Sequence, residues 1–242
     1  MNLHAQVENV EKKTDSVVVE TPQQLKFNKK QLIIPAVFIT YGFVGFDSDF
    51  LKAVNAEVRE EVQENIDHKF TIDDFTQYAP AASIYALSAF GVKSKNNFRD
   101  KTIILATSYL IMGVTVEALK KTTKVQRPDG SGFNSFPSGH TATAFMGAEL
   151  MYQEYKDVSP WYGIAGYVVA AGTGAFRMYN NRHWLTDVVA GAGIGILSAK
   201  AAYWLYPTVN NLLSSKKHEN TKSVFLPYYD GKQLGFGYVS SF

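Results

Sequence analysis

Three long apolar segments, separated by charged connections, constrain what this chain can fold into. They cover residues 102–119, 158–176 and 188–206, and none holds more than one charged side chain. Such segments form helices that cross a membrane or lie buried in a bundle, because about 20 apolar residues span the hydrocarbon layer of a bilayer. Lys200 is the single charge of the last segment, and we expect its ammonium group to reach the membrane interface. The pattern predicts an all-α, integral-membrane bundle.

Shorter segments bring the bundle to about six helices. The additional helical segments are residues 32–46, 78–92 and 141–155. The first of these is short for a membrane span and fits a buried helix as well. Residues 51–66, which lie between the first two of these segments, carry apolar side chains at helical spacing. They are part of an acidic segment, residues 47–77. This amphipathic helix either covers the domain surface or forms a flap at the membrane face, and we expect Asp73 or Asp74 to cap the helix after it.

Composition and the chain ends limit the function classes. Residues 1–30 are a polar tail, residues 31–215 the helical domain, and residues 216–242 a second tail in which an Asp-Gly turn between aromatic stretches predicts a short β-hairpin. The net charge of +2 is too small to indicate nucleic acid binding, and the absence of cysteine excludes disulfides. The first 20 residues are polar, so no cleavable signal peptide is predicted. The mean hydropathy of −0.12 is low for a membrane protein.

The sequence Pro137-Ser138-Gly139-His140 marks the start of a helix as a site for an anion. Ser138 is a favourable N-cap residue for the apolar run after it. Gly139 leaves the first backbone amides uncovered, and a helix N-terminus favours negative charge. A histidine therefore directly follows a predicted anion site.

Two other segments carry groups that suit the same anion. Lys120 and Arg127 are seven positions apart, which places them on one helical face if the helix persists as far as Pro128. His183 and Asp187 are four positions apart and thus share a helical face, where the carboxylate can hold one imidazole nitrogen protonated. Arg177 precedes them and offers a planar fork for phosphate oxygens.

Taken in order, Lys-x6-Arg-Pro, Pro-Ser-Gly-His and Arg-x5-His-x3-Asp resemble the three-part signature of the type 2 phosphatidic acid phosphatase and vanadate-haloperoxidase superfamily. The match runs from position 120 to position 187, with Phe176 where the family usually has a serine. The resemblance implies a four-helix catalytic core. It also implies that His183 is the nucleophile that forms a phosphohistidine, with Asp187 orienting it and His140 acting as general acid. By the same resemblance, the phosphate-binding residues are Lys120, Arg127, Ser138, Gly139 and Arg177.

The resemblance favours a lipid phosphatase of the cell envelope. No cluster of Asp and Glu typical of a magnesium or two-metal site lies near the motifs in the sequence, so we expect a reaction without metal or other cofactor. Its substrate would be a lipid phosphomonoester or pyrophosphate, such as lipid A, undecaprenyl pyrophosphate, phosphatidic acid or phosphatidylglycerol phosphate. Alternatives are a soluble acid phosphatase of the same superfamily, a vanadate-dependent haloperoxidase and a non-catalytic binder of lipid phosphates. The basic loop at 93–101 predicts an inside location for that loop, and the motifs then lie on the outer, periplasmic face of an inner membrane. The oligomeric state is left open.

Overall fold

The computed structural model describes residues 27–64 and 71–214, together with the backbone of residues 222–229 and 234–241. Its helices are η1 (Lys29–Leu32), α1 (Ile33–Val44), α2 (Asp49–Gln63), α3 (Asp73–Thr76), α4 (Ala79–Ala89), α5 (Phe98–Thr123), α6 (Gly139–Tyr155), α7 (Pro160–Tyr179) and α8 (Leu185–Leu213). The prediction of a helical bundle is confirmed. α2 is the expected amphipathic helix, and α3 is a single turn that the sequence did not predict.

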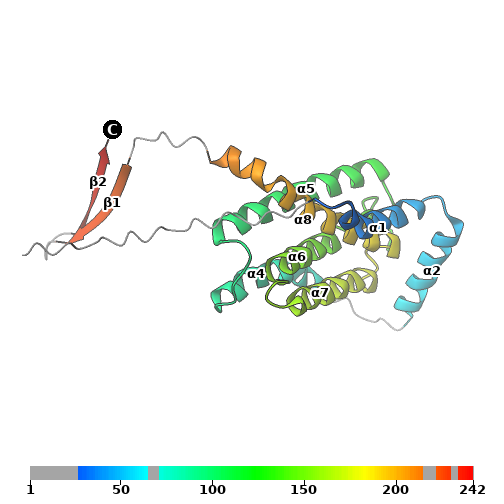
Figure 1. Ribbon diagram of the computed structural model, residues 1–242. Helices are drawn as coiled ribbons and strands as arrows, with labels where there is room; N and C mark the ends of the chain where they lie inside the picture. Colours follow the sequence, from blue (N-terminus) through cyan, green and yellow to red (C-terminus); the bar gives the residue numbers. More distant parts are fainter. Residues whose placement is uncertain (1–26, 65–70, 215–221, 230–233, 242) are drawn as a thin grey trace, which may run out of the picture.

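α6 lies at the centre of the bundle, with α4, α7 and α8 packed against it, while α1 and α5 pack on α8 (Figure 1). Small residues let these helices approach closely, as in membrane bundles. A Cβ atom added to Gly195 of α8 would lie 2.2 Å from the carbonyl oxygen of Ala142 in α6. One added to Gly147 of α6 would lie 2.8 Å from the backbone nitrogen of Ala81 in α4. At these two positions the helix backbones lie in direct contact, so a residue larger than glycine does not fit.

Polar side chains fix the starts of the long helices. The Asn97 side chain accepts a hydrogen bond from the backbone N–H of Asp100, 2.9 Å away, at the start of α5. α7 begins with a Ser159 cap followed by Pro160, a residue suited to the first helical position. The prediction that Asp73 or Asp74 caps the helix after them was wrong, because both lie within α3 and a turn separates them from α4.

Two of the described helices, α5 and α8, are long and apolar enough to cross a membrane. A third span is counted if α1, with the 3-10 turn before it, and α2 form one broken element, which bends by 93° between them. The helix lengths and compositions thus support fewer spans than the six helices of the sequence-based topology. α6 in particular buries Glu149, Gln153 and Glu154 inside the bundle.

Lys200 does not reach a membrane interface, contrary to the sequence-based prediction. Its ammonium group is buried and lies 2.5 Å from the carboxylate of Glu149 in α6. The carboxylate of Glu149 holds the Lys200 side chain within the bundle. If the ammonium group moved out to solvent, this buried carboxylate would lose its charged partner.

The C-terminal strands β1 (Lys222–Tyr229) and β2 (Leu234–Ser241) pair antiparallel. Their register places Tyr229 opposite Leu234 and Lys222 opposite Ser241. This pair lies where the Asp-Gly turn predicted a hairpin.

Candidate active site

The Ser138–His140 segment starts α6 as predicted and is held against α8. The hydroxyl of Ser138 accepts a hydrogen bond from the backbone N–H of Thr141 at 3.4 Å. The backbone N–H of Ser138 donates to the carbonyl oxygen of Asp187 at 3.0 Å. A Cβ atom on Gly191 would lie 2.5 Å from the carbonyl oxygen of Ser138, so only glycine allows this approach. The second and third motifs are thus joined through backbone atoms.

His183 and Asp187 lie side by side in the interior, His183 just before α8 and Asp187 in its first turn. Nδ1 of His183 is 3.6 Å from Oδ2 of Asp187, slightly beyond a hydrogen bond, and has no hydrogen-bond partner in the part of the chain that the structure describes. The same carboxylate oxygen accepts from the backbone N–H of Trp184 at 2.9 Å and from Ser135 Oγ at 2.5 Å. In enzymes without substrate, catalytic hydrogen bonds are often this long.

Burial lowers the pKa of His183 from its usual 6.5 to about 4, and the charges of Arg177 and Lys120 act in the same direction. The neighbouring carboxylate of Asp187 opposes this shift without reversing it. His183 is therefore a neutral imidazole near neutral pH, and a neutral imidazole keeps the lone pair that a nucleophile requires.

The first motif supplies two cations that meet on one loop residue. Lys120 Nζ donates to the carbonyl oxygen of Asn134 at 2.8 Å, and Arg127 Nε donates to its side-chain oxygen at 2.8 Å. The geometry predicted for them was wrong in one respect. α5 ends at Thr123, since Lys124 adopts a left-handed backbone with φ of 49°, so Arg127 lies in the loop rather than on the same helix.

Arg177, near the end of α7, is buried and borders both histidines. It forms an ion pair with Asp73, and its Nη1 lies 3.9 Å from Asp74 Oδ1. Its Nε has no hydrogen-bond partner among the described residues. The guanidinium charge contributes to lowering the pKa of His183 and the pKa of His140. The charge of Arg177 therefore acts on both imidazoles, and its buried Nε donor is left over for a ligand.

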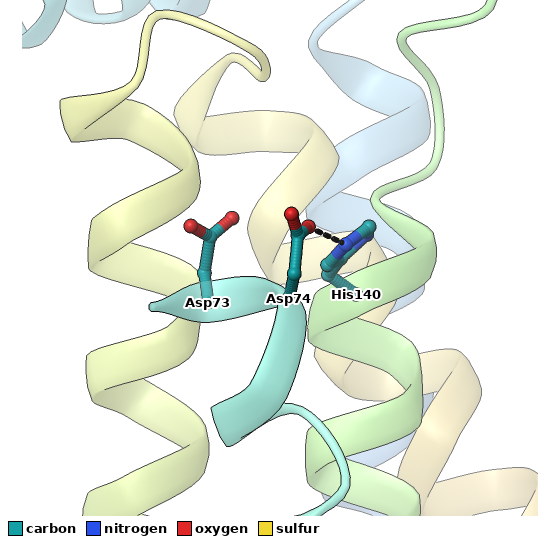
Figure 2. A group of neighbouring side chains, drawn as sticks. All are labelled: Asp73, Asp74 and His140. Atoms are coloured by element: carbon teal, nitrogen blue, oxygen red, sulfur yellow. Dashed lines mark hydrogen bonds and ion pairs between the residues drawn. The ribbon is translucent and has the colours of Figure 1, made fainter. Parts of the chain in front are cut away.

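His140 faces a carboxylate that the motif pattern did not identify. Its Nε2 lies 2.8 Å from Asp74 Oδ1, and Figure 2 shows Asp74 reaching from α3 to the ring on α6. Burial lowers the pKa of His140, as does the charge of Arg177, while Asp74 and Asp73 raise it. Whether the imidazole of His140 is protonated therefore depends on which anion lies next to the ring.

Asp73 and Asp74 are the site residues that sequence reasoning missed. Asp73 is fully buried, bonded to Arg177 and to Asn180 Nδ2 at 2.9 Å. One ligand atom from each of Asp73, Asp74 and His140 lies within 4.8 Å of the others, an arrangement that could hold a metal ion (Figure 2). Here Arg177 and the imidazole are the partners of these carboxylates. The only sequence signal was their place in the acidic segment 47–77.

The remaining predicted positions add little to the site. Gly139 is the first residue of α6, and Phe176, at the position of the family serine, contacts the ring of Tyr179 edge-on at 5.9 Å. The other histidines of the chain, His4, His68 and His218, lie outside the described residues. From their polar surroundings in the sequence we expect them at the surface.

A cavity of about 490 Å³ opens beside Asp187. Its lining includes Phe46, Lys52 and Asn55 from the α1–α2 region and Trp184 from the loop before α8. α2 is attached to α8 here, since the side chain of Asn55 donates to Thr186 Oγ1 at 3.0 Å and accepts from its backbone N–H at 3.2 Å. A volume of this size suits a small ligand or the headgroup of a larger one.

The described residues thus form a helical bundle that carries two histidines, each beside a carboxylate. Residues 101–211 match the family model described as the PAP2 superfamily. Through this segment the chain is similar to the PAP2 superfamily.

Two curated relatives are similar to this chain. Over 157 residues it is 42% identical to a lipid A 1-phosphatase of Porphyromonas gingivalis, a match covering 62% of this chain and 35% of the relative. Over 77 residues it is 35% identical to the bacitracin transport permease protein BcrC of Bacillus licheniformis, covering 32% of this chain and 36% of that protein. The matched segments thus span about a third of the length of these relatives.

Two solved structures are also similar. The crystal structure of Aquifex aeolicus LpxE is 22% identical, with a TM-score of 0.47, and the match covers 62% of this chain and 94% of that one. The PAP2 type phosphatidylglycerolphosphate phosphatase from Bacillus subtilis is 18% identical, with a TM-score of 0.46, covering 78% of this chain and 100% of that one.

Proposed function

We propose that this protein is a phosphatase that removes a phosphomonoester from a membrane lipid through a phosphohistidine on His183. The observation that carries this is the buried imidazole of His183, whose Nδ1 lies 3.6 Å from the buried carboxylate of Asp187. The charge of Arg177 acts on this imidazole and on that of His140. The 42% identity to a lipid A 1-phosphatase supports the phosphatase class and favours a phosphorylated glycolipid as substrate. The two candidate membrane spans support access to a lipid.

In the first step, the ring nitrogen of His183 that faces away from Asp187 attacks phosphorus. A P–N bond forms as the P–O bond to the lipid breaks, and His140 gives its proton to the departing alkoxide. In the second step, water gives a proton to His140 and attacks the phosphohistidine. The P–N bond breaks, and inorganic phosphate and free His183 are regenerated.

The cations and backbone amides stabilise the charge on the phosphoryl oxygens in both steps. Arg127 and Arg177 offer planar hydrogen-bond donors, Lys120 a point charge, and Gly139 the backbone amide at the start of α6, next to the hydroxyl of Ser138. Phosphoryl transfer depends mostly on such positioning and charge stabilisation. Asp74 holds the ring of His140 in place until the substrate phosphate arrives, when the phosphate dianion itself raises the pKa of that imidazole.

The cavity beside Asp187 is the proposed place for the headgroup next to the phosphate. Trp184 and Phe46 offer aromatic surfaces, and Lys52 and Asn55 offer polar groups, a combination that suits a sugar. The Lys52 ammonium group is half-exposed and lies 3.7 Å from Asp49. Lys52→Ala should lower kcat/KM for a lipid A 1-phosphate and leave kcat/KM for phosphatidic acid unchanged. Equal loss on both lipids would exclude a headgroup role for this cavity.

The main test is phosphate release from defined lipids by the purified full chain in detergent. We expect hydrolysis of lipid A phosphate in the presence of EDTA, and no turnover by His183→Ala. Brief reaction with ³²P-labelled substrate, followed by quenching in alkali, should leave label on wild-type protein that acid releases. Dependence on added divalent metal would point instead to the cluster of Asp73, Asp74 and His140. Acid-stable label would contradict the phosphohistidine.

A soluble phosphatase of the same superfamily is the second candidate, because the mean hydropathy is only −0.12. Carbonate extraction separates the two: a protein held by α5 and α8 stays in the membrane pellet. We place the protein in the inner membrane, with the catalytic face in the periplasm. Cysteine introduced at an exposed position of the 129–133 loop should react with an impermeant thiol reagent in intact spheroplasts.

A further inference from the structure

A second cavity, of about 420 Å³, lies between the start of α1 and helices α6, α7 and α8. None of the catalytic or phosphate-binding residues lines it. Glu149, which does, follows His140 by nine positions on α6, so it lies about 14 Å from His140 along the helix axis. The site proposed for catalysis therefore does not account for this cavity.

A buried ion pair forms one wall. Glu149 accepts from Lys200 Nζ at 2.5 Å, from Gln153 Nε2 at 2.6 Å and from the hydroxyl of Tyr167. These donors satisfy the carboxylate, but burying two charges costs several kcal/mol per ion before they attract one another. Ionisable groups kept inside a membrane bundle usually face a cavity and serve a function. Nothing in the proposed phosphatase mechanism uses this pair.

The two ammonium groups on the cavity lining suit an anion. The ammonium group of Lys200 has three N–H donors and gives one to Glu149. Lys30 adds a second ammonium group at the rim, so the lining carries two positive charges against one negative charge. The side-chain oxygen of Gln31 is buried and has no hydrogen-bond partner in the described part of the chain.

The other walls are apolar. They are formed by Ile34, Phe38, Phe145 and Ile196. A free phosphate ion would leave these surfaces without a partner, whereas a phospholipid would place its phosphate near the ammonium groups and its acyl chains against the apolar walls. Basic pockets between membrane helices bind anionic headgroups in this way.

We propose that this cavity binds the headgroup of an anionic phosphodiester lipid, such as phosphatidylglycerol, as a bound lipid that is not a substrate. The phosphate contacts Lys30 and Lys200, and a headgroup hydroxyl donates to the side-chain oxygen of Gln31. A phosphodiester lacks the monoester bond that the catalytic site is proposed to cleave. The binding can therefore be measured without turnover.

The test is native mass spectrometry of the purified full chain with phosphatidylglycerol, and with phosphatidylcholine as the zwitterionic comparison. Lys30→Glu reverses the charge at the rim and should weaken phosphatidylglycerol binding by about tenfold or more. Lys29→Glu is the matched control, because Lys29 is an exposed neighbour in the same turn that does not line the cavity. It should bind phosphatidylglycerol within about twofold of wild type.

Equal weakening in both variants would overturn the proposal, since it would reflect surface charge alone. Wild-type affinity in Lys30→Glu and in the charge-free pair Glu149→Gln with Lys200→Met would also overturn it. Glycerol phosphate binding as tightly as the lipid would reject a lipid site, because the apolar walls would then contribute nothing. The same measurements on His183→Ala should match wild type, so this result does not depend on the phosphatase proposal.

Discussion

Arg177→Lys is the sharpest test of the proposed phosphate site. The guanidinium group uses one nitrogen for Asp73 and keeps a buried Nε donor for a ligand. A lysine ammonium group at this position keeps the positive charge, but it cannot donate to Asp73 and to a ligand with the planar geometry of a guanidinium group. The variant therefore loses about one charged donor to the transition state, worth about 3 kcal/mol, or about 100-fold in kcat. Because Arg177 is only 8% exposed, solvent screens this loss little.

The assay is phosphate release from lipid A phosphate as a function of pH, with thermal unfolding measured on the same samples. The limbs of the pH profile should keep their positions, because the charge beside both histidines is retained. Arg182→Lys is the matched control: its guanidinium lies 3.1 Å from Asp129, is partly exposed, and should change kcat by less than about twofold. A loss below tenfold in Arg177→Lys, or a similar loss in the control, would refute the proposed role of Arg177.

Three further predictions follow from the same geometry. The kcat/KM of wild type should rise with pH as His183 loses its proton, with an apparent pKa of about 4, and a rise centred near the usual 6.5 would contradict a lowered pKa for this imidazole. On the alkaline side kcat/KM should fall as His140 loses its proton; Asp74→Asn removes a group that raises the pKa of that imidazole, so this limb should move to lower pH. Gly191→Ala forces a Cβ atom to within 2.5 Å of a backbone oxygen and should lower stability by about 1–3 kcal/mol and reduce kcat. Gly172→Ala meets nothing within 4 Å in α7 and should raise stability by about 1 kcal/mol, so chemical denaturation of the two variants should give opposite signs.

Local spacing allowed the best part of the site to be predicted from sequence. His183 and Asp187 are four positions apart, and their side chains lie 3.6 Å from one another as expected. The predicted shared helical face was wrong, because α8 begins at Leu185 and His183 precedes it. Ser138 likewise indicates the start of α6, because a serine side chain suits the N-cap position of a helix. These positions were predicted because the interactions that define them lie within one turn of the chain.

The contacts that could not be predicted join distant segments. Asp73 and Arg177 are 104 positions apart, and Asp74 and His140 are 66 apart, so no periodicity connects them. The ammonium group of Lys200 was expected at an interface because Glu149, its partner in α6, is 51 positions away. Side chains of this kind are ambiguous in a sequence, since their place depends on a partner that only the packed bundle supplies.

His183 and His140, the proposed catalytic pair, are held in place by different interactions. This difference affects which of the two is in place before the substrate binds. His183 is buried, and its surroundings are fixed by backbone contacts between Ser138 and the first turns of α8. His140 depends on the carboxylate of Asp74, which is 51% exposed and belongs to a single helical turn. A substrate phosphate can therefore compete with Asp74 for the imidazole without disturbing the packing that holds the nucleophile. In the proposed mechanism the nucleophile is then in place before the substrate binds, whereas the substrate phosphate raises the pKa of the imidazole that acts as the acid.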